Sequence, residues 1–137
     1  MKKATEIYKE CLEDDYWYGT GDYQPMLEQF GEIVVQVDDN DYQGDSRVLY
    51  KDKKRYGWLQ FGWGSCSGCD ALQACSSIDE IQELMDELKH QIKWFESAHE
   101  CHDYFSEKDW SIDYSWMADQ QREFINKVKK QTKRRIK

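Results

Sequence analysis

Hydrophobic positions in the second half of the chain follow a helical period. They recur in alternating steps of three and four residues and end in two histidines: Ile78, Ile81, Met85, Leu88, Ile92, Phe95, His99 and His102. Ser77 and Glu80 stand three residues apart at the start of this run, in the positions that a capping box uses. The pattern therefore predicts one long helix over about residues 78–106.

Shorter helical patterns lie on either side of this segment. The stripe in residues 2–12 consists of Ala4, Ile7, Tyr8, Cys11 and Leu12. Pro25 suits the first turn of a short helix over 25–30, because proline is favoured at that position. Near the end of the chain, Met117, Phe124, Ile125 and Val128 line a final helix that continues into a basic tail.

Three runs in the first half are typical of strands. Residues 32–37 and 47–50 are rich in β-branched and aromatic side chains, and so is the run over 55–63. Short polar links join them, which favours an antiparallel meander. We expect an α+β fold in two layers: a three-stranded antiparallel sheet packed against the long helix, with N- and C-terminal helices, in a single domain over 1–137.

Composition narrows the class of protein. The chain has 137 residues, and its 15% aromatic content argues against disorder. No apolar run approaches the roughly 18 residues of a membrane span, and the N-terminus lacks the apolar region of a signal peptide. We therefore expect a cytoplasmic protein without a membrane partner.

The net charge of −8 is unevenly distributed. Residues 1–121 carry 11 basic and 26 acidic side chains, a balance of −15, whereas 122–137 carry eight basic and one acidic, a balance of +7. An acidic body suits a basic protein surface and repels nucleic acid, so direct nucleic-acid binding is not expected. A solvated face and helical tail would give the same counts.

Five cysteines without an export signal favour metal or redox chemistry over disulfides. Cys66 and Cys69 form a C-x2-C pair after the third strand, and Cys75 follows six residues later. Such thiolates can converge on Zn²⁺, which prefers four sulfur or nitrogen ligands. Small buried cysteines beneath the sheet remain an alternative.

The fourth zinc ligand is left open by the sequence. Candidates are His99, Cys101 and His102 on the long helix, Cys11 on the first helix, or water. The helix candidates face a geometric objection, because His99 would lie about 30 Å along an unbroken helix from Ile78.

Other chemistry has weaker support. A thioredoxin-like redox role for Cys66 and Cys69 lacks the proline that such a fold places after the motif. The run over 39–44 begins like a calcium loop but has Tyr50 where glutamate belongs, and it is better interpreted as an acidic hairpin with Gly44 at positive φ. No catalytic constellation stands out, so we expect a non-enzymatic protein.

The run Phe61-Gly62-Trp63-Gly64-Ser65-Cys66-Ser67-Gly68-Cys69-Asp70-Ala71-Leu72-Gln73 supports a resemblance. With Tyr42-Gln43-Gly44-Asp45, Tyr56-Gly57 and Ile92-Lys93-Trp94-Phe95, it resembles a family of small phage and prophage proteins over about residues 42–95. In size, acidity and cysteine cluster the chain is also similar to zinc-containing anti-CRISPR proteins of streptococcal phages. That resemblance implies Cys66, Cys69 and Cys75 as zinc ligands and a type II CRISPR effector nuclease as partner.

Charge and resemblance together lead to one functional hypothesis. We expect a zinc-stabilised inhibitor that binds the effector nuclease of the host and blocks target DNA loading or cleavage, since the nuclease holds its heteroduplex in a positively charged channel. The acidic hairpin residues Asp38, Asp39, Asp41 and Asp45 are the expected contact surface. The alternative is a phage accessory protein that binds nucleic acid through the basic tail, about 122–137.

Overall fold

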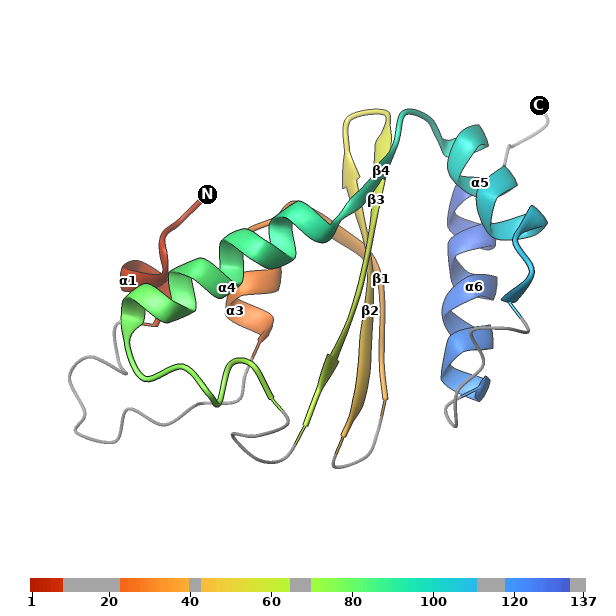
Figure 1. Cartoon of the computed structure of the whole chain (residues 1–137). Coiled ribbons are helices and arrows are strands. Elements are labelled where there is room, and N and C mark those ends of the chain that lie inside the picture. Colours follow the sequence, from red (N-terminus) through yellow and green to blue (C-terminus); the bar gives the residue numbers. More distant parts are fainter. Residues whose placement is uncertain (9–22, 40–42, 65–69, 111–117, 134–137) are drawn as a thin grey trace.

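The sheet is antiparallel and has four strands in the order β1-β2-β3-β4 (Figure 1). The strands are β1 (Glu32–Asp38), β2 (Gly44–Asp52), β3 (Arg55–Trp63) and β4 (Lys93–Phe95). The expected α+β class is confirmed, but the expected three strands are one too few. The computed structural model describes residues 1–8, 23–39, 43–64, 70–110 and 118–133.

The central strands form a long hairpin. β2 and β3 pair from Gly44 opposite Trp63 to Asp52 opposite Arg55. The turn between them contains Lys53 and Lys54, and Lys53 has φ 58°, in the left-handed region. The tight connection expected here is thus present, in a conformation that glycine or asparagine more often adopts.

Helices cover both faces of the sheet, so the fold has three layers where two were expected (Figure 1). One face carries α1 (Ala4–Ile7), α3 (Gln24–Leu27) and α4 (Ile78–Gln91). The other carries α5 (Ala98–Glu107) and α6 (Ala118–Thr132).

Helices are present near both ends of the chain and at Pro25, where the sequence predicted them. α1 lies within the segment 2–12 predicted as helical, and residues 9–22 lie outside the described residues. α3 overlaps the predicted turn over 25–30 but begins one residue earlier, at Gln24. α6 buries Phe124, Ile125 and Val128 as predicted, while Met117 is outside the description. None of the helices in the described ranges is both long and apolar enough to cross a membrane.

The predicted helix over 78–106 is wrong as a single element. α4 ends at Gln91, Ile92 has the extended ψ of 123°, and β4 then pairs with β3, with Trp94 opposite Gly57. A second helix begins after Ser97, whose side chain accepts a hydrogen bond from the Glu100 amide. The helix is interrupted here because β4 pairs with the free edge of β3. Helical periodicity in the sequence does not show that this pairing is available.

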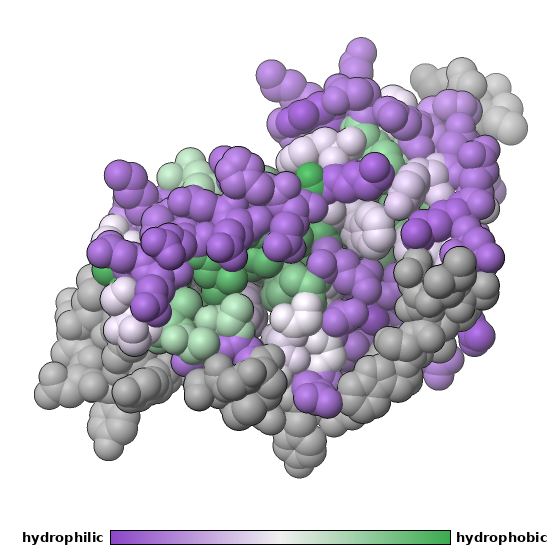
Figure 2. All heavy atoms as spheres, in the orientation of Figure 1, coloured by the Kyte–Doolittle hydropathy of each residue, from purple (hydrophilic) through white to green (hydrophobic). Residues whose placement is uncertain are grey.

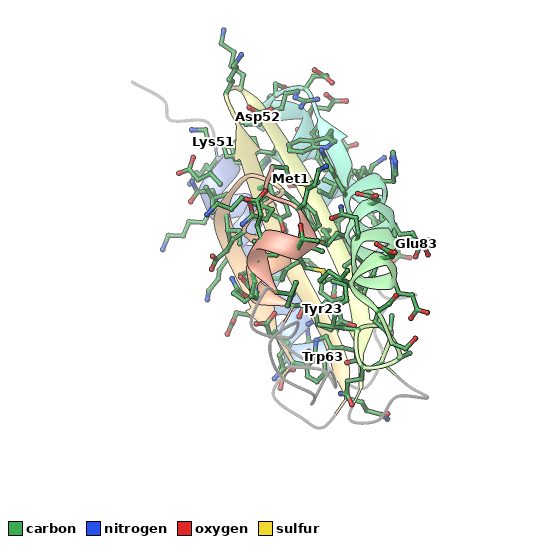
Figure 3. The ribbon with its side chains drawn as sticks, turned by 90° about the vertical axis from the view of Figure 1, so that its left-hand side faces the viewer. Met1, Tyr23, Lys51, Asp52, Trp63 and Glu83 are labelled. Carbon is green, nitrogen blue, oxygen red and sulfur yellow. The ribbon has the colours of Figure 1, made fainter. Side chains whose placement is uncertain are left out.

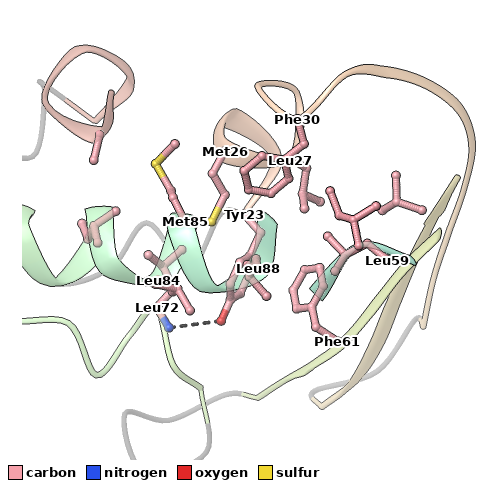
Figure 4. Close-up of a cluster of buried hydrophobic side chains, with 14 of the residues drawn as sticks. Tyr23, Met26, Leu27, Phe30, Leu59, Phe61, Leu72, Leu84, Met85 and Leu88 are labelled. Atoms are coloured by element: carbon pink, nitrogen blue, oxygen red, sulfur yellow. Dashed lines mark hydrogen bonds between the residues drawn. The ribbon is translucent and has the colours of Figure 1, made fainter. Parts of the chain in front are cut away.

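Each face of the sheet has its own hydrophobic core. The core on the α4 face includes Met26, Leu27, Tyr50, Leu59 and Met85 (Figure 4). The core on the α5–α6 face contains these buried side chains: Val35, Val37, Leu49, Tyr56, Phe95, Cys101, Phe105, Trp110, Phe124, Ile125 and Val128. Strands buried on both faces read as continuous apolar runs, which is the pattern of Val48–Tyr50.

Candidate functional site

Asp70 ties the end of β3 to the turn before α4. Its carboxylate is buried and accepts hydrogen bonds from the Gly64 amide at 3.0 Å, the Leu72 amide at 2.9 Å and the Gln73 amide at 3.2 Å. The Gln73 side chain adds a second tie, since its Nε2 donates to the Gly64 carbonyl at 2.9 Å. The exit of β3 is therefore fixed to the turn that leads to α4.

Tyr23 supports this connection from the α3 side. Its hydroxyl donates to Asp70 Oδ1 at 2.7 Å and accepts from the Leu72 amide at 3.1 Å (Figure 4). Burial, reinforced by the hydrogen bond to Asp70, raises the pKa of Tyr23 above its ordinary value. The phenol therefore stays neutral and donates to the carboxylate at physiological pH.

Cys66 and Cys69 lie outside the described residues, between Gly64 and Asp70 in the sequence. Cys75 is described and buried, and its thiol donates to the Ala71 carbonyl at 3.3 Å. Burial raises the pKa of Cys75, and the nearby carboxylates of Glu80 and Asp70 raise it further. A raised pKa keeps this thiol protonated, whereas a zinc ligand is a thiolate, so the surroundings of Cys75 in the described structure do not support the zinc prediction.

The candidates for a fourth ligand on α5 lie away from Cys75. Cys101 is fully buried in the core on the α5–α6 face, whereas Cys75 belongs to the core on the opposite face. His99 is exposed and pairs with Asp103 at 3.2 Å, and His102 lies on the same helix. The structure does not bring these three side chains together with Cys75, because the sheet separates them.

Cys101 and Cys11 are the remaining cysteine candidates for a metal ligand. Burial raises the pKa of the Cys101 thiol to about 12, with a smaller contribution from Glu100, which keeps the thiol protonated. Cys11 lies outside the described residues, and within the described ranges no three His, Cys, Asp or Glu side chains are grouped to hold a metal. Zinc binding remains a prediction from the sequence.

The expected acidic contact surface is divided by the fold. Asp38 is exposed and Asp45 is half-buried, but Asp39 is buried and forms an ion pair with Arg47 at 2.7 Å. Asp41 lies outside the described residues. Asp39 is thus occupied inside the protein, and it cannot contribute to a partner surface as expected.

Asp39 belongs to a polar network that joins the β1–β2 hairpin to α6. Its Oδ2 accepts from the Asp45 amide at 2.8 Å, while Arg47 Nε donates to Gln121 Oε1 at 2.5 Å. Gln60 Nε2 donates to both Asp45 and Gln121 at 3.1 Å. Because the network satisfies the buried charges, its role is structural.

Gly44 differs from its expected conformation for the same reason. It lies in β2 without a positive φ, and a Cβ atom there would sit 2.5 Å from the Cβ of Asp39. The glycine is needed for close approach to the buried aspartate and not for the geometry of a turn.

An acidic surface that sequence reasoning missed lies on α4. Five exposed carboxylates occupy nine residues of its outer side, and we call them the α4 acidic face: Asp79, Glu80, Glu83, Asp86 and Glu87. Glu83 points away from the body of the protein (Figure 3), and hydrophilic side chains cover α4 above the hydrophobic core (Figure 2). Among the described residues, none of these acids forms an ion pair.

The sequence did carry a signal for this surface. Helical spacing of Ile81, Leu84, Met85 and Leu88 buries one side of α4 and leaves the intervening acids on the other.

Comparisons with protein-family models, curated proteins and solved structures found no match to this chain.

Proposed function

We propose that this chain is a non-enzymatic, phage-encoded inhibitor that binds a type II CRISPR effector nuclease through an acidic surface and blocks target DNA loading or cleavage. The α4 acidic face is the observation that carries the proposal. It moves the expected contact from the Asp38–Asp45 hairpin to a helix with five exposed carboxylates, none of which has an ion-pair partner among the described residues.

Charge density is the first argument for a nucleic-acid-binding partner. Residues 79–87 span about 12 Å of helix axis, since each residue rises ~1.5 Å. Five carboxylates over that length give about one charge per 2.4 Å, between the ~1.7 Å of duplex DNA and the ~3.4 Å of one strand. A groove built for a phosphate backbone therefore suits this helix.

The second argument is that no described cation neutralises these carboxylates, although Glu80 accepts hydrogen bonds from Ser76 and Asp86 accepts one from Gln82. Lys89 and His90 are the basic side chains of α4, and both lie in its last turn, beyond the acids. The acids therefore keep their charge for a partner, and complementary charge accelerates association. Asp70 supports the position of α4, because its carboxylate ties the end of β3 to the turn before the helix.

A cleavage assay with a type II effector nuclease, combined with a pull-down, tests the proposal. The informative variant is Glu83→Lys/Glu87→Lys, and its matched control is Glu96→Lys/Glu107→Lys, which changes the net charge equally at exposed positions outside α4. We expect the α4 variant to lose inhibition at least tenfold through slower association, with an unchanged melting temperature, and the control to inhibit like the wild type.

Two results would contradict the proposal. Cleavage that continues at a stoichiometric excess of the wild-type protein removes the tested nuclease as the partner. Equal inhibition by the α4 variant and its control shows that total charge, and not the α4 acidic face, is responsible.

A further inference from the structure

A pocket at one end of the sheet gathers basic side chains that are distant in the sequence. It lies between the β2–β3 turn, the start of α5 and the end of α6, and it has a volume of about 680 Å³. Lys51, Lys53 and Lys54 line it from the hairpin, and Lys133 lines it from the end of α6. No described acidic side chain lines the pocket.

The lysines of the pocket retain their charge. Within the described part of the chain, none of the four forms an ion pair. Of the acids next to the lining residues, Asp52 pairs with Arg55 at 3.2 Å and Asp103 lies 3.2 Å from His99. Glu96 and Glu100 flank the start of α5 and form no ion pair in the described structure. Lys51 is held along the pocket wall, with Nζ 5.9 Å from the centre of the Tyr56 ring.

The β2–β3 turn itself is not optimised for folding. Lys53 adopts φ 58°, and a lysine there costs free energy relative to the glycine or asparagine that such turns favour. The two adjacent lysines thus place two charges at the pocket rim at the expense of local stability. Strain of this kind is typical of functional positions.

The acidic body does not cancel this positive region. The α4 acidic face lies on the other side of the sheet from α5 and α6 (Figure 1). Exposed charges separated by more than a Debye length, about 10 Å at 0.1 M salt, are largely screened from one another. Among the described residues that line the pocket, the charged side chains that a ligand would meet are the four lysines.

We propose that this pocket binds closely spaced phosphate groups, as found in a nucleic-acid backbone or in a polyphosphate. Lysine ammonium groups act as compact point charges for phosphate, and several around one pocket suit a ligand with several negative charges. The inference is independent of the proposed inhibition, which rests on α4. It departs from the expectation, drawn from the acidic body, that the chain does not bind nucleic acid directly, since the hairpin places three lysines in the same pocket as Lys133.

The test uses a fluorescently labelled 20-nucleotide poly(dT) strand and measures anisotropy at several salt concentrations, with tripolyphosphate as a competitor. The variant is Lys53→Gln/Lys54→Gln. The control is Lys2→Gln/Lys3→Gln, which removes two adjacent exposed lysines away from the pocket. We expect the pocket variant to bind about tenfold more weakly and to reduce the slope of log affinity against log salt by about 1.4, which corresponds to ~0.7 per lost contact with a single strand.

The two probes distinguish the sources of phosphate. Binding of poly(dT) that tripolyphosphate displaces only at millimolar concentration indicates a nucleic-acid backbone. Tripolyphosphate binding without poly(dT) binding indicates a free polyphosphate, and the same variant should weaken it. The proposal is overturned if neither probe binds at 50 mM salt, about the lower limit of such titrations, or if the pocket variant and the control behave alike.

Discussion

Asp70 has an unusual set of neighbours for a single carboxylate. Among the described residues, the four groups within hydrogen-bond distance are all donors: the Tyr23 hydroxyl and the amides of Gly64, Leu72 and Gln73. An ionised aspartate accepts from all of them, whereas an asparagine of the same shape presents its NH₂ group to at least one other donor. Charge, and not only size, is therefore required at this position.

The substitution Asp70→Asn should lower the free energy of unfolding by about 2–3 kcal/mol, because a buried donor is left unsatisfied. Tyr23→Phe is the milder comparison, since it removes one hydroxyl, and it should cost about 1 kcal/mol. Urea unfolding at a fixed zinc concentration measures both. If Asp70→Asn is as stable as the wild type, the carboxylate does not tie the end of β3 to the turn before α4 as described.

Short strand β4 depends on a glycine in the neighbouring strand. Gly57 pairs with Trp94, and a Cβ atom at Gly57 would lie 2.7 Å from Cγ2 of Ile92 and 2.8 Å from the Trp94 ring. Arg55 packs on the same indole ring, 4.5 Å from its centre. The absence of a side chain at Gly57 thus lets the residues after α4 join the sheet.

Gly57→Ala should therefore destabilise the protein by about 1–3 kcal/mol through overpacking. Gly62→Ala on the same strand is the control, because its Cβ would meet only the Asp45 side chain, at 3.3 Å, and the Gly44 carbonyl oxygen, at 3.7 Å. Hydrogen exchange of the Lys93–Phe95 amides should accelerate in the first variant and not in the second. Equal exchange in both would show that β4 does not rely on this close approach.

Elements with a single strong signal could be predicted from the sequence. The three long strands and the capping box at Ser77 are present, and the Ser77 hydroxyl accepts from the Glu80 amide at 3.2 Å. β4 could not be predicted, because Ile92 and Phe95 continue the helical period and no glycine or proline interrupts it. The second capping box, Ser97 with Glu100, was the available sign that another helix starts there.

The sequence predicted two layers where the fold has three, and the reason for this error is different. β1 contains a register shift between Ile33 and Val35, so Ile33 packs in the α4-face core while Val34 and Val35 pack in the other. A bulge of this kind changes which side chains face each way, and simple alternation cannot show it. Apolar side chains on both faces of the strands were the evidence for a second helical layer.

Charge is organised on the scale of the whole molecule. The sequence predicted an acidic body and a basic end, but not where each charge is exposed. Asp39 is neutralised by Arg47 inside the fold, and the exposed acids concentrate on α4. The basic end is joined by the hairpin lysines across the second face. Those groupings arise from tertiary packing, which counts of charged residues along a chain do not contain.

The predicted zinc ion would act on this arrangement through shape. Cys66 and Cys69 follow β3 and Cys75 precedes α4, so a metal held by all three would fix the orientation of α4 on the sheet, together with Asp70. Structural zinc contributes its binding energy to folding. Loss of the metal should therefore release α4 and weaken binding to the proposed nuclease partner in parallel with the folded fraction.

Elemental analysis of the purified protein should show about one zinc per chain, as a single four-ligand site requires. Cys69→Ser or a chelator should remove the metal and lower the melting temperature, because the folded state loses its bound ion. Cys101→Ala should keep the full zinc content, since Cys101 lies in the core across the sheet from Cys75. Zinc-free protein with the melting curve of the untreated sample would contradict a structural metal. Zinc lost from Cys101→Ala with the fold intact would contradict the separation of the two cysteines.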